Sequence, residues 1–105
     1  MMNLAGIRKM IVPLVRQSPA EKAIIFGSYA RGEADKYSDL DLLIISGSER
    51  PFVERYKDYW NIFLRFPGAM EMVVYRPEEF SRMKKEENPF IERVNQEGKV
   101  IYEKR

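Results

Sequence analysis

Hydrophobic and polar residues follow one another in blocks along the chain, and the spacing inside each block predicts a secondary structure. Near the N-terminus, apolar residues recur at intervals of three and four, as on one face of a helix. These residues are Leu4, Ile7, Ile11, Leu14 and Val15. The pattern predicts an amphipathic helix over residues 3–17, which Pro13 should kink or split because proline removes a backbone hydrogen bond and clashes with the preceding turn.

Four short apolar runs have the length and composition of strands. They cover residues 23–26, 42–45, 70–75 and 99–102. Helical spacing returns between the later runs, with a helix from about Pro51 to Leu64, another starting at Pro77 and a third stopping at Gly98. This order of elements predicts a single α/β (α+β) domain over residues 1–105, with a small mixed sheet, helices packed on one face and carboxylates gathered at the other.

The helix expected at 51–64 is unusually aromatic. Its apolar positions recur at threes and fours: Phe52, Val53, Tyr56, Tyr59, Trp60, Phe63 and Leu64. The simplest interpretation is a helix that packs on the sheet. The alternative is that some of these side chains contact a partner, because monomers seldom expose large apolar patches. The sequence leaves both interpretations open.

The candidate chemistry lies in residues 22–45. Gly27 and Ser28 interrupt the apolar run, and glycine lets a phosphate come close to the backbone. Asp39 and Asp41 lead into the next run, and alternate residues of a strand project from one face about 6 to 7 Å apart. Two carboxylates at that spacing can share a divalent cation. Taken singly, a Gly-Ser pair is usually a turn and Asp-x-Asp usually a solvated strand end or a helix cap; the ordered combination is more specific.

Composition narrows the chemistry further. The chain has no cysteine and no histidine, so a metal site must use oxygen ligands, which suits magnesium or manganese. Its 18 basic and 16 acidic residues are interspersed and give a net charge of +2, which does not favour nucleic acid as a partner. No apolar run approaches the roughly 18 residues of a membrane span, and the N-terminus lacks a signal-peptide pattern. We therefore expect a cytoplasmic protein that does not bind membranes.

The pairs Gly27-Ser28, Arg31-Gly32, Ser38-Asp39 and Asp41-Leu42 resemble the signature of the nucleotidyltransferase superfamily typified by DNA polymerase beta. The closest branch is the minimal nucleotidyltransferases, or MNT proteins. The resemblance implies the polymerase beta-like fold, a Gly-Ser turn that holds a nucleoside triphosphate, and two aspartates that bind magnesium. It also implies a third acidic residue on a neighbouring strand.

Glu71 is the candidate for that third acid, because it is the one charge in the apolar run of residues 70–75 and burying it uncompensated would be costly. A neighbouring strand in register would aim it at Asp39 and Asp41. The family usually has aspartate here, and a plain charge at a strand end is the competing interpretation. Arg31 and Lys36 lie between the turn and the acidic strand, where a cation could neutralise phosphate oxygens, although a solvated surface role fits each equally well.

The resemblance implies a magnesium-dependent enzyme, with two ions, that transfers AMP from ATP to an acceptor hydroxyl. It further implies that the acceptor is a protein, since MNT proteins often act as antitoxins to HEPN-domain RNases. The alternative is a degenerate fold that binds nucleotide or a partner without turnover. A transferase acting on a small molecule or RNA ranks last, because such relatives carry an additional domain.

Overall fold

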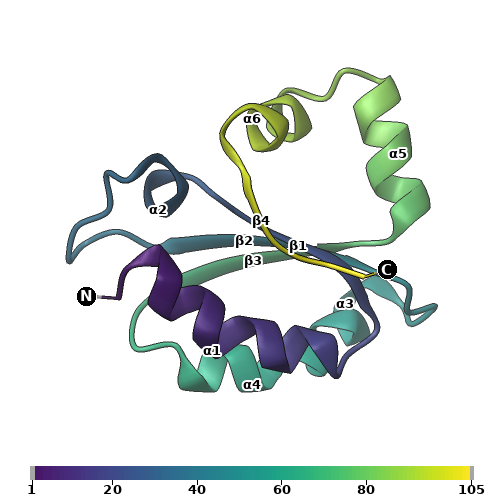
Figure 1. Cartoon of the computed structure of the whole chain (residues 1–105). Helices are drawn as coiled ribbons and strands as arrows, with labels where there is room; N and C mark the ends of the chain where they lie inside the picture. The colour runs from purple at the N-terminus through teal and green to yellow at the C-terminus, as the bar shows by residue number, and fades with distance from the viewer. Residues whose placement is uncertain (1, 105) are drawn as a thin grey trace.

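The computed structural model describes residues 2–104, which form a four-stranded sheet with helices on both faces (Figure 1). The strands are β1 (Ala20–Phe26), β2 (Leu40–Ser46), β3 (Met70–Tyr75) and β4 (Lys99–Glu103), in the order β3-β2-β1-β4. β1 runs antiparallel to β2 and β4, whereas β2 and β3 are parallel. The mixed sheet and the α/β class predicted from the sequence are confirmed.

The first face of the sheet carries the larger core. It is covered by α1 (Leu4–Arg16) and by the crossover between the two parallel strands, which contains α3 (Phe52–Arg55), the 3₁₀ helix η1 (Tyr56–Tyr59) and α4 (Trp60–Arg65). Parallel strands need such a crossover because the end of β2 and the start of β3 lie at opposite ends of the sheet. The core residues on this side are fully buried and include Ile7, Ile11, Ile25, Leu42, Ile44, Tyr59, Ile62 and Val74.

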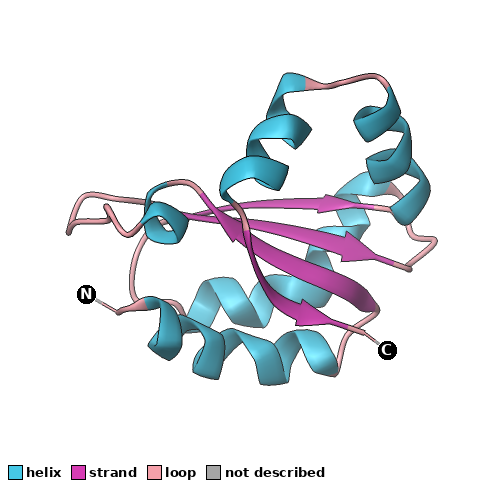
Figure 2. Ribbon diagram, turned by 45° about the horizontal axis from the view of Figure 1, so that its top comes forward, coloured by secondary structure: helices cyan, strands magenta, loops and turns pink. Residues whose placement is uncertain are grey.

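The second face is covered in part by α5 (Pro77–Lys85) and α6 (Pro89–Glu97), which Figure 2 shows above the sheet. A smaller core of Ile24, Phe26, Leu43 and Val94 lies between α6 and the sheet. Helices were expected on one face only, so this arrangement differs from the prediction. The physical reason is visible in β1, where consecutive apolar residues are buried on both sides, as in strands covered on both faces.

Two predicted helices also differ from the structure. Pro13 lies inside α1 without splitting it, near its C-terminal end and with an exposed ring. The single helix expected from Pro51 to Leu64 is instead divided into α3, η1 and α4. The division turns Tyr59 and Ile62 into the core and leaves Trp60 and Leu64 exposed. No helix within residues 2–104 is both long enough and apolar enough to span a bilayer.

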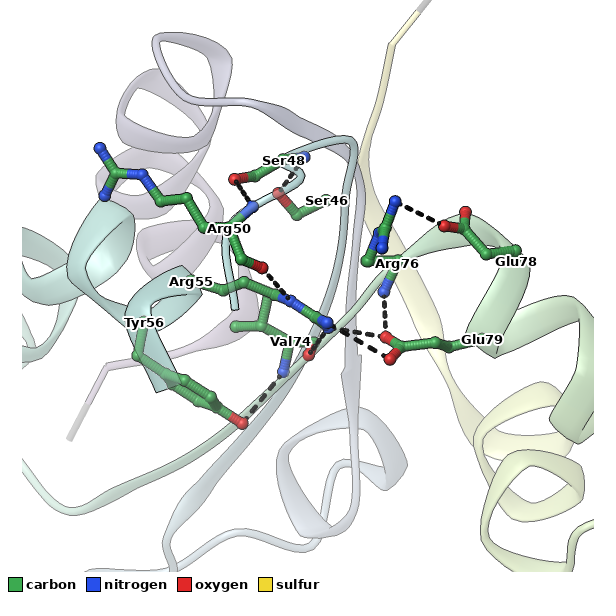
Figure 3. A network of polar contacts seen from close by, with 9 residues as sticks. All are labelled: Ser46, Ser48, Arg50, Arg55, Tyr56, Val74, Arg76, Glu78 and Glu79. Carbon is green, nitrogen blue, oxygen red and sulfur yellow. Dashed lines mark hydrogen bonds and ion pairs between the residues drawn. The ribbon is translucent and has the colours of Figure 1, made fainter. Parts of the chain in front are cut away.

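A buried arginine joins the two helical layers around the β3 edge (Figure 3). Arg55 on α3 is only 5% exposed, and its guanidinium donates to both carboxylate oxygens of Glu79 on α5, at 2.6 and 3.3 Å. It also donates to the backbone carbonyls of Val74 and Arg50. A buried charge needs such a full set of partners. Because Arg55 binds both Glu79 of α5 and the Val74 carbonyl of β3, the network fixes α5 relative to the sheet.

Candidate active site

The turn after β1 forms the first part of the candidate site. Gly27 has φ +74° and ψ −154°, a backbone conformation that is essentially restricted to glycine. A side chain here would also collide with the carboxylate of Asp41, first of all with Oδ2. Glycine is therefore required for the turn and for the close approach of Asp41. The short helix α2 (Ser28–Arg31) begins immediately afterwards, with Ser28 half-buried.

Acidic side chains meet at the beginning of β2 and β3. The parallel register places Asp41 directly beside Glu71. Leu40 and Leu42, which flank Asp41, are fully buried on the opposite face, so the strand is anchored while Asp41 stays partly exposed. Asp39 is exposed and precedes β2 by one residue. The structure thus brings Asp41 and Glu71 together, and Asp39 lies two residues before Asp41, outside β2.

The crowding of these acids changes the protonation of Asp41. Burial, the negative charge of Glu71 and hydrogen bonding with that carboxyl group raise the pKa of Asp41 to about 6. Asp39 adds a smaller contribution in the same direction, and the positive charge of Arg93 opposes it. Ionising Asp41 is therefore costly in the absence of a cation, and a bound cation would relieve that cost.

The residues suit a magnesium ion by their chemistry. Carboxylate oxygens are the ligands that Mg²⁺ prefers, and it commonly takes one or two from the protein together with substrate phosphates. Within residues 2–104 no three metal-ligating side chains already converge. Asp41 and Glu71 are adjacent, so an ion bound to all three acids requires the exposed side chain of Asp39 to turn toward that pair.

Two residues of α6 reach the same region and were missed by the sequence analysis. Glu97 accepts hydrogen bonds from the Gly27 N–H at 3.0 Å, from Arg31 Nη1 at 3.0 Å and from Arg93 Nε at 3.2 Å. The Arg93 guanidinium also lies over the ring of Phe26, 5.9 Å from its centroid. Apart from the i,i+4 pair of Arg93 and Glu97, these contacts join segments about seventy residues apart, and the helical pattern of residues 90–98 gives no local signal for them.

The two predicted phosphate-binding cations lie in different surroundings. Arg31 is held by Glu33 and Glu97 close to Gly27. Lys36 instead lies over the ring of Tyr37 and lines a cavity of about 500 Å³ that borders Asp39. The other walls of this cavity come mainly from Tyr29, Phe66 and the loop that precedes β3. The structure therefore places Arg31 at the turn and Lys36 on the side of Asp39.

Comparison with protein families gives a match along most of the chain. The family described as "Polymerase beta, Nucleotidyltransferase" matches residues 9–105. This range contains the turn, the acids and the α6 residues described above.

Individual relatives are proteins of Methanocaldococcus jannaschii named as candidate protein adenylyltransferases. One is 33% identical over 82 residues, which cover 78% of this chain and 78% of the relative. Another is 35% identical over 86 residues, which cover 77% of this chain and 57% of the relative. A third is 36% identical over 53 residues, which cover 50% of this chain and 57% of the relative. The chain thus spans little more than half the length of two of these relatives.

Solved structures share the fold at low sequence identity. A chain of a toxin–antitoxin complex solved with AMP-PNP superimposes with a TM-score of 0.69 at 16% identity, covering 93% of this chain and 74% of that one. A chain from the complex of a tri-AMPylated Shewanella oneidensis HEPN toxin with its MNT antitoxin gives 0.59 at 15% identity, covering 92% and 70%. The resemblance predicted from the motif residues is confirmed, and this chain belongs to the polymerase beta nucleotidyltransferase family.

Proposed function

We propose that the chain is a magnesium-dependent nucleotidyltransferase that moves AMP from ATP to a hydroxyl group of a partner protein. One observation carries the proposal: the backbone of Gly27 packs against the carboxylate of Asp41, which itself lies beside Glu71. A triphosphate held at the turn would therefore lie next to the acids that bind its metal. This adjacency is what in-line transfer at the α-phosphorus requires.

Each residue has a defined part in the proposed reaction. Gly27 and Ser28 hold the triphosphate, and Arg31 and Lys36 neutralise phosphate oxygens. Asp39, Asp41 and Glu71 would hold two Mg²⁺ ions, with Mn²⁺ as a substitute. When bound, the ions stabilise the charge that develops on the transferred and leaving phosphates.

The proposed reaction exchanges one phosphorus–oxygen bond for another. The acceptor oxygen attacks the α-phosphorus of ATP, the bond from that phosphorus to the bridging oxygen of the β-phosphate breaks, and pyrophosphate leaves. The acceptor loses its proton, and Glu71 is placed on the acidic face where it could accept that proton. The products are an AMP ester of the acceptor and pyrophosphate.

A HEPN-domain protein is the partner that we propose. The support is that an MNT antitoxin of the same fold is found in complex with an AMPylated HEPN toxin, and that relatives are named as candidate protein adenylyltransferases. In this proposal the chain is the antitoxin of the pair, and it acts in the cytoplasm.

A second candidate function rests on two observations. No three acids converge as a finished metal site within residues 2–104, and Glu71 stands where the family usually has aspartate. A domain of this kind could bind nucleotide, or neutralise a toxin by contact alone, without turnover. The exposed side chains of Trp60 and Leu64 would be available for such contact.

Calorimetry with ATP, with and without Mg²⁺, tests the proposed function. We expect magnesium-dependent binding that is lost in Asp39→Asn/Asp41→Asn and retained in Glu86→Gln/Glu92→Gln, which removes two exposed acids elsewhere. Incubation with ATP and a HEPN-domain protein should then add AMP to that protein, as read by mass spectrometry. Binding without transfer would favour the second function, and nucleotide binding unaffected by loss of both aspartates would overturn the first.

A further inference from the structure

The last residue of α6, Glu97, is hydrogen-bonded to the turn after β1. Glu97 is 17% exposed at its side chain, and its two carboxylate oxygens accept hydrogen bonds from three donors. Oε1 accepts from the Gly27 N–H and from Arg93 Nε, and Oε2 accepts from Arg31 Nη1. A backbone amide and two guanidinium groups are more than an exposed surface ion pair provides, and such an arrangement holds the carboxylate in one place.

Glu97 and Asp41 fix the Gly27 residue from two sides. The N–H of Gly27 is bound to Glu97, while the Gly27 α-carbon packs against the carboxylate of Asp41. The position of the turn relative to the metal-binding acids therefore depends on both contacts. Asp41 lies on the sheet beside Glu71, whereas Glu97 lies on α6.

Glu97 also orients Arg31 without using up its hydrogen-bonding capacity. The guanidinium donates Nε–H to Glu33 at 2.7 Å and one Nη1–H to Glu97 at 3.0 Å. An arginine has five N–H donors, so three of them are left for another anion. Two carboxylates bind different N–H groups of the guanidinium and so restrict its orientation, and the remaining N–H groups can donate to another anion.

The charges within this cluster stabilise one another. Burial alone would raise the pKa of Glu97, but hydrogen bonds from Arg31 and from the Gly27 N–H outweigh it and lower that pKa. Hydrogen bonds to Glu33 and Glu97 raise the pKa of Arg31. Both side chains are therefore charged throughout the neutral range, so their attraction does not change there with pH.

The next residue explains how α6 comes close enough. A side chain at Gly98 would collide with the Val94 carbonyl oxygen and with the Ile24 side chain of β1, the latter at 2.7 Å. The absence of a side chain thus lets the end of α6 lie directly on β1. This contact brings Glu97 within reach of the turn that follows the same strand.

We infer that Glu97 is a positioning residue for the phosphate site: it holds the Gly27 turn and aims Arg31 at the triphosphate. This inference deepens the proposed function and rests on it. Glu97 acts through Gly27 and Arg31 and does not itself contact the nucleotide. Its removal should therefore weaken the binding of phosphates while leaving the acids of β2 and β3 in place.

The affinity for MgATP and for magnesium tripolyphosphate tests the inference, using Glu97→Gln with Glu92→Gln as the matched control on the same helix. Glutamine keeps the length and an acceptor for the Gly27 N–H but loses the charge that holds Arg31. We expect affinity for both ligands to fall about tenfold in Glu97→Gln and to be unchanged in Glu92→Gln. Melting temperatures of the same samples verify that both variants are folded at the assay temperature.

The opposite result has a distinct meaning. If Glu97→Gln binds MgATP as well as the wild type, then Glu97 does not position Arg31 for phosphate. If the variant binds MgATP more tightly, then Glu97 competes with phosphate for the Arg31 side chain. Either outcome overturns the inference.

A second measurement separates this inference from the proposed function. In the nucleotide-free protein, ¹⁵N NMR should show slow exchange of the Gly27 amide and of the Arg31 Nη1–H, both of which donate to Glu97. Both should exchange faster in Glu97→Ala, which removes the acceptor, and not in Glu92→Ala. Unchanged exchange in Glu97→Ala would overturn the inference even if the wild type binds ATP. A wild type that binds neither ATP nor tripolyphosphate would reject the proposed function and the phosphate role of Glu97 together, while the exchange data would still show whether Glu97 holds the turn.

Discussion

At the scale of single residues, the candidate site depends on one backbone conformation. Gly27 combines a dihedral pair restricted to glycine with a contact to Asp41 that leaves no room for a β-carbon. The sequence analysis predicted the turn and the acids that flank it. It could not predict Glu97, because nothing near residue 97 in the sequence distinguishes an acid that faces solvent from one that binds a turn seventy residues earlier.

Gly27→Ala should therefore both destabilise the fold and abolish nucleotide binding. The backbone strain alone costs about 1–3 kcal/mol, and the new methyl group displaces Asp41. Urea unfolding gives the stability change and calorimetry the loss of binding. The comparison is Gly32→Ala, which also has positive φ but nothing within 4 Å of the added carbon, so its cost should stay near 1 kcal/mol. Equal stability losses for the two variants would argue against the contact with Asp41.

The raised pKa of Asp41 predicts a pH dependence in metal-free protein. The carboxyl group titrates near pH 4 when unfolded and at about 6 when folded, so between these values the folded state binds more protons. Stability should fall as pH rises from 4 to 6 and remain lower by about 1–2 kcal/mol above that range. Asp41→Asn should lack this loss and should be more stable than the wild type at pH 8.

Magnesium provides the control for this prediction. At pH 8 the ion should raise the melting temperature of the wild type and have little effect on Asp41→Asn, because a bound cation favours the ionised carboxylate. Identical pH profiles for the two metal-free proteins would contradict the assignment of the acid cluster.

At the scale of elements, the sequence predicted the strands and most helices, and the errors have identifiable causes. The four apolar runs became β1 to β4 with small changes of boundary. Helices on one face only were expected, but the unbroken apolar run at the end of β1 is buried on both sides of the sheet. Periodicity over residues 51–64 predicted one helix, since spacings of three and four fit both a continuous helix and a divided one.

The division of that segment determines which of its apolar residues support the fold. Ile62 is fully buried, whereas Leu64 is 83% and Trp60 60% exposed. Ile62→Ala should lower the free energy of unfolding by about 2–5 kcal/mol. Leu64→Ser and Trp60→Ser should change it by no more than about 0.5 kcal/mol. Chemical denaturation of the three variants measures these changes, and a large loss in Leu64→Ser would show that the isolated fold depends on this surface.

At the scale of the whole molecule, the helices on one face of the sheet must be held in a fixed position relative to those on the other face. The Arg55–Glu79 pair does this at the β3 edge, joining α3 on one face to α5 on the other (Figure 3). Neither residue stands out in the sequence, because the pairing joins positions 24 residues apart on two surface-like helices. The pKa of Glu79 is lowered, first of all by its hydrogen bonds from Arg55.

Glu79→Gln should destabilise the protein by roughly 2–4 kcal/mol, because it leaves the buried Arg55 guanidinium without a counter-charge. The stabilisation by Glu79 is fully present above its unfolded pKa of 4.5 and should be lost as pH falls below that value through the lower folded pKa. Glu78→Gln, which breaks an exposed pair with Arg76, is the control and should cost less than about 1 kcal/mol. Equal losses would mean that the buried pair has no special role.

The contact between α6 and the turn also sets an order of events during synthesis. A nascent chain that has emerged only through β3 already contains Gly27, Asp41 and Glu71, but lacks the carboxylate that holds the turn. Residue 97 must leave the ribosome before Arg31 acquires its second partner. Full affinity for a triphosphate would therefore arise late, once α6 has been synthesised, and chains that lack it would bind ATP more weakly.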